Sequence, residues 1–225
     1  ANTELRLAGG FVIEEPAFKV YAPNITQDVE TGIGAWSDEE IVRAIREGVR
    51  RDGTLIGPPM PIPSYREMSD FDVRAIVAYL RTVPPVRNIV PRSEYHIPLP
   101  ESWGPPLGAV PDVPRDDKLA YGAYLGNALG HCMECHTPMV DGEFDFSRTG
   151  AGGMVFEKPY GLEFAVMAAN ITPHPEQGIG SWTDDEIKRA ITQGISRDGR
   201  RHRPLMGFDY YRNISGEDLD ALVVY

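Results

Sequence analysis

The sequence predicts an all-α fold in which two tandem copies of one helical unit are connected through long loops. The main observation is an internal repeat, because residues 24–79 align without a gap on residues 170–225 with about half of the positions identical. Each copy also carries helix-start signals followed by apolar residues at helical spacing. No segment shows the sustained apolar–polar alternation that is typical of a strand.

Two helices are expected in each copy. Residues 37–40 (Ser-Asp-Glu-Glu) and 183–186 (Thr-Asp-Asp-Glu) are capping boxes, and an apolar stripe follows each of them. Ser69 and Ser215 begin the second helix of the two copies, and a loop with a methionine runs between the paired helices. Residues 1–23 read as a loop with few regular features.

Residues 84–115 are proline-rich, which predicts an extended, semi-rigid connector between the copies. A further helix of the second copy is expected from about residue 116. Gly122 and Gly126 lie four positions apart on it, so another helix could cross closely there. Flexibility at the helix end is the alternative interpretation of these glycines.

The chemistry is concentrated in Cys132-Met133-Glu134-Cys135-His136, which contains both cysteines of the chain. Two thiols three positions apart on a helical turn can add across the two vinyl groups of one porphyrin. The next residue, His136, then brings an imidazole under the iron. This spacing therefore predicts covalent attachment of c-type haem.

A zinc site and a thioredoxin-like dithiol are the alternatives for the two cysteines. Zinc would need two more ligands, and the remaining histidines form no compact pair at zinc-ligand spacing. These histidines are His96, His131, His174 and His202. A thioredoxin-like motif normally follows a strand, whereas residues 118–129 read as a helix.

A second ligand to the iron is expected from the methionine loop. Met206 lies 70 residues after His136, and Met60 occupies the equivalent position in the first copy. A thioether ligand raises the reduction potential relative to a second imidazole. His202 is a rival ligand, but it is aligned with Ile56, so the repeat favours methionine.

Charge and hydrophobicity exclude some classes of function. The formal net charge is −11 and the isoelectric point is about 4.9, which argue against a nucleic-acid partner. No apolar run is long enough to span a bilayer, and no signal peptide begins the sequence. We therefore expect a soluble chain that is either mature or cut from a longer one.

The repeat also gives an expectation for the edges of the sequence. Residues 8–10 (Ala-Gly-Gly) match residues 151–153, which follow the haem motif of the second copy. Extending the alignment backwards places the first copy's haem motif upstream of Ala1. Loss of the haem from the first copy is the alternative.

Several motifs occur twice around the haem motif: Asn-Ile-Thr, Gly-Ile-Gly-x-Trp-Ser/Thr-Asp, Arg-Asp-Gly and a Pro-x-Met loop. With them the chain resembles the multihaem cytochrome c subunits of bacterial membrane-bound alcohol, gluconate and sugar dehydrogenases. The resemblance implies two tandem class I cytochrome c domains at residues 1–83 and 116–225, with a linker at 84–115. It also implies export to the periplasm, at the outer face of the inner membrane.

The resemblance further implies a role for individual residues. Cys132 and Cys135 would form thioethers, and His136 and Met206 would be the axial ligands. Met60 would bind a second haem, attached upstream of Ala1. Four residues would line the haem pockets or meet the propionates, namely Asn170 and Trp182 with their counterparts Asn24 and Trp36. The alternative is that the asparagines start turns and the tryptophans pack in the core.

In this family the subunit takes electrons from a quinoprotein or flavoprotein dehydrogenase subunit and passes them to quinone or a terminal oxidase. Protein ligands on both faces of the iron favour electron transfer over catalysis, so we expect no residue to act as acid, base or nucleophile. Membrane association is expected only through partners or missing segments. The alternatives are a dihaem enzyme, such as a peroxidase or thiosulfate dehydrogenase, and a haem-free binding module.

Overall fold

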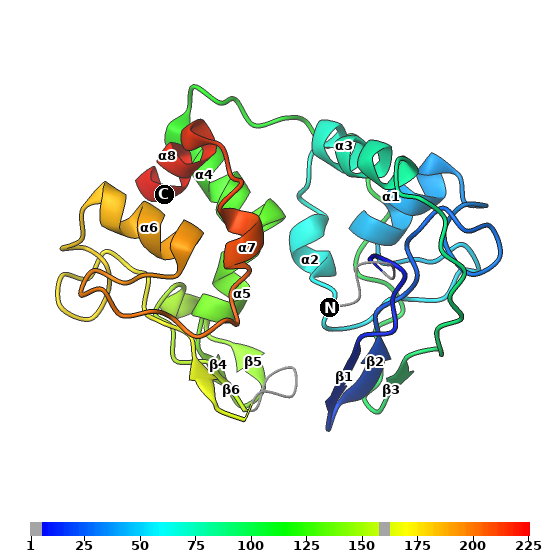
Figure 1. Ribbon diagram of the computed structural model, residues 1–225, viewed down its shortest axis with the longest axis horizontal. Helices are drawn as coiled ribbons and strands as arrows, with labels where there is room; N and C mark the ends of the chain where they lie inside the picture. Colours follow the sequence, from blue (N-terminus) through cyan, green and yellow to red (C-terminus); the bar gives the residue numbers. More distant parts are fainter. Residues whose placement is uncertain (1–5, 158–162) are drawn as a thin grey trace. The chain divides into compact units, whose positions relative to one another are not determined.

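The computed structural model describes residues 6–157 and 163–225 (Figure 1). The chain divides into two compact units, Ala1–Asp112 (unit 1) and Val113–Tyr225 (unit 2). The domain boundaries that the sequence indicates, at residues 83 and 116, remain a prediction. None of the helices in the described ranges is long and apolar enough to cross a membrane.

In the described part of unit 1, from residue 6 onward, three helices accompany a small sheet. Its elements are β1 (Val12–Glu15), β2 (Phe18–Tyr21), α1 (Asp38–Arg46), α2 (Ile62–Tyr65), α3 (Asp70–Arg81) and β3 (Glu94–Tyr95). The sheet is antiparallel with the order β1-β2-β3. Its core cluster brings α1 and α3 together through the buried side chains Ile33, Ile41, Val77 and Leu80.

Unit 2 contains the haem motif and the following elements: α4 (Lys118–Tyr124), the π-helix η2 (Leu125–Leu129), α5 (Cys132–His136), β4 (Met139–Val140), β5 (Glu143–Phe144), the 3₁₀ helix η3 (Phe146–Arg148), β6 (Val155–Phe156), β7 (Val166–Met167), α6 (Asp184–Gln193), α7 (Phe208–Tyr211) and α8 (Gly216–Val224). Its strands form two antiparallel hairpins, β4-β5 and β6-β7.

The predicted helix starts are confirmed. Ser37 and Thr183 each accept a hydrogen bond from the backbone N–H of the glutamate three residues later, whose carboxylate accepts from the cap's own N–H. Ser69 and Ser215 cap α3 and α8 in the same manner, each accepting one backbone N–H. Local capping chemistry therefore fixes the same helices in both copies of the repeat.

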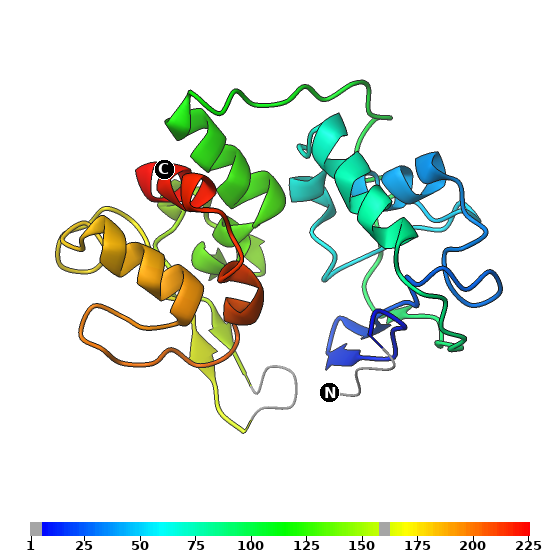
Figure 2. The ribbon, with the colours of Figure 1, turned by 45° about the horizontal axis from the view of Figure 1, so that its top comes forward.

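Helices α4 and α8 cross closely in unit 2 (Figure 2). A Cβ atom on Gly122 would overlap the backbone of Ala221, so only glycine fits at this crossing. The buried residues Tyr121, Tyr124 and Ala128 complete the cluster. The glycine spacing in the sequence thus marks a close helix contact.

The predicted all-α class is wrong. Helices account for only 32% of the residues and strands for 10%, and each unit contains antiparallel strands. The expectation of two all-α cytochrome domains is corrected accordingly. The physical reason is that these strands have only two to four residues, too few to show an alternating pattern, and that hairpin turns and backbone pairing define them instead.

Most of the proline-rich segment belongs to unit 1, which extends to Asp112, and packs on the rest of that unit. Its strand β3 pairs with β2, placing Tyr95 opposite Phe18. Trp103 donates from Nε1 to the carbonyl of Ile56 at 2.9 Å. The amide of Gly57 donates to the Tyr95 hydroxyl at 3.0 Å. The segment therefore lies against the loop that carries Met60.

Candidate haem site

The two cysteines of the haem motif lie on one helical turn, in α5. Both are free thiols, Cys132 partly buried and Cys135 exposed. Desolvation raises the pKa of both thiols, and the negative charge of Glu134 adds to the shift at Cys135. A reactive dithiol has a lowered pKa, so this direction of shift gives no support to a thioredoxin-like pair.

His136 is buried at the end of α5 and is held in one orientation. Its Nδ1 lies 2.7 Å from the carbonyl oxygen of Ala169. A carbonyl can only accept, so Nδ1 carries the proton and the lone pair lies on Nε2. Burial lowers the pKa of the imidazole, which keeps it neutral, as a metal ligand must be.

The strand pair β6-β7 brings the Ala169 carbonyl to His136. The amide of Gly152 donates to the His136 carbonyl at 2.7 Å, and the amide of Gly153 donates to Ala168 at 2.9 Å. A Cβ on Gly152, whose φ is +69°, would overlap the backbone of Ala169. This glycine allows the chain to pass between α5 and the segment that orients the imidazole.

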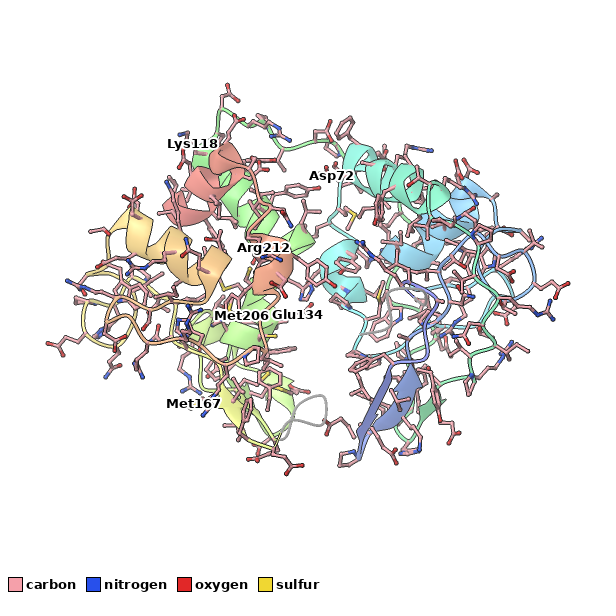
Figure 3. The ribbon with its side chains drawn as sticks, viewed as in Figure 1. Asp72, Lys118, Glu134, Met167, Met206 and Arg212 are labelled. Carbon is pink, nitrogen blue, oxygen red and sulfur yellow. The ribbon has the colours of Figure 1, made fainter. Side chains whose placement is uncertain are left out.

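Met206 lies in the loop before α7 (Figure 3), and the residue is 38% exposed. The amide of Phe208 donates to the Met206 carbonyl at 2.9 Å, just as Ile62 donates to Met60 at 2.8 Å in unit 1. Among the described residues no hydrogen bond joins Met206 to α5. The pairing of Met206 with His136 therefore stays a prediction, and so does ligation by Met60.

His202 lies on the same loop as Met206. Its backbone amide donates to the carbonyl oxygen of Gly194 at 2.7 Å, and in unit 1 the amide of Ile56 donates to the carbonyl oxygen of Gly48 in the same way. Its ring stacks on Phe208 with the centroids 6.4 Å apart. The side chain thus contacts α7, which gives no support to its role as a rival ligand.

Asn170 begins a turn directly after Ala169. Its Oδ1 accepts from the amide and the hydroxyl of Thr172 at 2.9 and 2.6 Å. Asn24 makes the same two contacts with Thr26 in unit 1, at 3.0 and 2.8 Å. These contacts match the alternative interpretation of the asparagines as turn residues.

Trp182 lines a cavity of about 420 Å³ together with Ser196, Arg197, Asp198 and Arg200. The guanidinium of Arg197 donates to the Ser181 carbonyl at 2.8 Å, and its Nε lies 3.6 Å from Oε1 of Glu186. Hydrogen bonds from Ser196 and Arg200 lower the pKa of Asp198 to about 2. Trp36 is partly buried and packs against the core cluster of unit 1. Haem contacts of either tryptophan stay a prediction.

Sequence reasoning missed the carbonyl that orients His136. Ala169 lies 33 residues away, and any residue can supply a backbone carbonyl. The repeated Ala-Gly-Gly was an indirect signal, because a Cβ on Gly9 would also overlap backbone, at Ala22. The repeat therefore preserves this close approach in both units.

Comparisons with known proteins show what this chain is similar to. No family model matches the chain. It is 35% identical over 205 residues to a subunit of nicotinate dehydrogenase from Pseudomonas putida, covering 84% of this chain and 16% of the relative. It is 34% identical over 200 residues to the cytochrome c subunit of alcohol dehydrogenase (quinone) of Gluconobacter oxydans, covering 83% of this chain and 41% of the relative.

A third relative matches the full chain. It is the protein "Diheme cytochrome c-type" of Cereibacter sphaeroides, 29% identical over 238 residues, which cover 100% of this chain and 76% of the relative. The chain is a homologue of dehydrogenase cytochrome c subunits. It spans less than half the length of the two dehydrogenase subunits named above.

The residues of this cytochrome c homologue fit a haem c group. The donor set comprises two thiols on one turn, a neutral imidazole with its lone pair on Nε2, and a thioether in an exposed loop. Apolar residues of α6 that are only partly buried, Ile187, Ala190 and Ile191, add further apolar surface to unit 2. The spacing of the two thiols suits thioether bonds to the vinyl groups of haem, and the neutral Nε2 of His136 suits its iron, whereas ligation by Met206 stays a prediction.

Proposed function

We propose that the chain is an electron-transfer cytochrome c that receives electrons from a dehydrogenase catalytic subunit and passes them to quinone or a terminal oxidase. The observation that carries the proposal is the buried His136, whose Nδ1–H is held by Ala169. A fixed, neutral imidazole favours an iron whose ligands do not rearrange on oxidation or reduction. The similarity to dehydrogenase cytochrome c subunits supports the same function.

Each residue of the site has a defined task in this proposal. Bound haem c supplies a one-electron change at its iron. Cys132 and Cys135 would hold the group through two thioethers, and His136 would ligate the iron through Nε2, with its orientation set by Ala169. Met206 would be the second protein ligand, and its thioether would raise the reduction potential relative to a second imidazole. No side chain transfers a proton or attacks a substrate, so the chain is a carrier and not the catalytic subunit.

We propose in addition that Met60 binds a second haem, attached by residues outside this sequence. Its loop repeats the hydrogen bonds of the Met206 loop. Gly9 repeats the close backbone approach of Gly152. One relative is named a dihaem cytochrome, which is in keeping with two sites.

The partner in this proposal is a quinoprotein or flavoprotein dehydrogenase subunit. The place of action is the periplasm, at the outer face of the inner membrane, which the chain reaches through partners or through segments outside this sequence. Names of the relatives as subunits of dehydrogenases support the partner class. The net charge of −11 disfavours nucleic acid.

Haem stoichiometry and substrate-driven reduction test the proposal. Intact mass and the pyridine haemochrome assay, on protein from the native source, would give the number of haems. Low-spin spectra with the weak red-region band of a methionine ligand, and reduction when dehydrogenase and substrate are added, are the expected results. A colourless protein would refute haem binding. A haem that binds cyanide quickly would point to an open site and against a simple carrier.

A further inference from the structure

Two short hairpins of unit 2 carry large apolar side chains that are exposed to solvent. Six of them, between 36% and 73% exposed, form what we call the hairpin patch: Met139, Val140, Phe144, Phe146, Val155 and Met167. Five of them lie on the strands of the hairpins, and Phe146 begins η3 shortly after β5. These strands lie together at one end of unit 2 (Figure 1), where Figure 3 labels Met167. Exposed apolar patches of this kind mark interaction sites in soluble proteins.

Strand pairing places two pairs of these side chains opposite each other, one pair on each hairpin. Met139 lies directly opposite Phe144, and Val155 lies opposite Met167. The rings of Phe144 and Phe146 approach to 5.8 Å between centroids. Asp141 and Gly142, with φ of 53° and 85°, form the two-residue turn that fixes the first hairpin. The patch is therefore built on defined secondary structure.

Acidic side chains accompany the hairpin patch. Asp141, Glu143 and Glu157 are exposed and have no ion pair within the described residues. Arg148, in contrast, is held by Asp145 at 2.6 Å. Protein interfaces combine an apolar core, enriched in aromatic residues and Met, with a polar rim of complementary charge. The complementary face would have an apolar centre ringed by Lys and Arg.

We propose that the hairpin patch is the docking surface for the catalytic subunit of the dehydrogenase, which presents such an apolar, basic-rimmed face. This inference rests on the proposed electron-transfer function. β4 begins three residues after His136, so a partner seated on the patch lies close to the site that receives the electron. A short distance matters because electron transfer slows steeply as donor and acceptor separate.

Charged substitutions within the patch test the inference. Phe146→Glu and Met167→Glu place a charge where the partner's apolar face would dock. The electron donor is the dehydrogenase subunit that co-purifies with the chain from its native membranes, supplied with its substrate. We expect it to reduce each variant at least ~10-fold more slowly than the wild-type chain. Leu119→Glu is the matched control, because Leu119 is 57% exposed on α4 of the same unit, and it should reduce at the wild-type rate. Ascorbate should reduce all four proteins equally.

The outcomes separate this inference from the function on which it rests. Wild-type chain that ascorbate reduces but the dehydrogenase does not would refute the proposed function. Phe146→Glu and Met167→Glu variants reduced at the full wild-type rate would overturn the docking surface alone.

Hydrogen exchange keeps the test decisive should the variants fail to bind haem. In the wild-type complex, residues 139–146 and 163–167 should exchange more slowly than in the free chain, and unchanged exchange would overturn the inference. The inference would also be overturned if these residues were slowed by phosphatidylcholine–phosphatidylglycerol vesicles and not by the dehydrogenase, which would identify a lipid surface as the occupant. Slower exchange only on self-association would overturn it as well and would identify a second copy of the chain.

Discussion

Gly152 permits the close backbone approach that orients the proximal histidine. Its φ of +69° disfavours a side chain, and a Cβ there would overlap the backbone of Ala169. We expect Gly152→Ala to lower the free energy of unfolding by roughly 3 kcal/mol, the sum of backbone strain and overpacking. The displaced Ala169 carbonyl should also hold Nδ1 of His136 less firmly and so raise the reduction potential. Denaturant titration and redox potentiometry measure the two effects.

Gly153 provides the matched control for this prediction. Its φ is +90°, but no atom lies within 4 Å of an added Cβ. Gly153→Ala should therefore cost only the strain of roughly 1–2 kcal/mol and leave the potential unchanged. Equal losses of stability in the two variants would show that overlap with Ala169 is unimportant.

Met206 allows a test of the second axial ligand. Met206→His should remove the red-region band of the methionine ligand and lower the reduction potential by on the order of 0.1 V, because imidazole stabilises ferric iron better than a thioether. Met167→Leu is a suitable control, since Met167 is also exposed but lies on β7. A band that persists in Met206→His would exclude Met206 as the ligand.

Side chains at the site could be predicted from the sequence, whereas the backbone partner could not. The residue types and spacing of Cys132, Cys135 and His136 are enough to predict covalent haem attachment. The acceptor for His136 is a main-chain carbonyl, and only the fold decides that Ala169 supplies it. Such contacts leave a trace only where they demand glycine, as at Gly152.

At the level of elements, the crossing of α4 and α8 depends on Gly122. A Cβ there would overlap the Ala221 backbone and lie 2.9 Å from the Cβ of Tyr225. We expect Gly122→Ala to destabilise the protein by about 3 kcal/mol by forcing the helices apart. Gly216→Ala at the start of α8 meets no atom within 4 Å and should be neutral or slightly stabilising. Equal stability of both variants, measured by thermal unfolding, would contradict the close crossing.

Helices and strands differed in how well the sequence predicted them. The helices that begin after Ser37, Thr183, Ser69 and Ser215 follow from capping chemistry that is local in sequence. The hairpins depend on pairing between short segments, and the strand β3 pairs with β2 from more than 70 residues away. Two to four residues carry too little periodicity to identify such strands in advance.

For the whole molecule, the net charge of −11 leads to a prediction about association with the dehydrogenase. If the partner presents a basic rim, the rate of haem reduction by the dehydrogenase should fall severalfold, roughly three- to tenfold, as salt rises from about 20 to 200 mM, because ions screen charges beyond the Debye length. An uncharged hydroquinone should reduce the haem at a rate that salt does not change. Stopped-flow measurements at both salt concentrations compare the two donors. A rate of haem reduction by the dehydrogenase that does not depend on salt would show that charge does not guide this encounter. The apolar side chains of the hairpin patch would then direct docking alone.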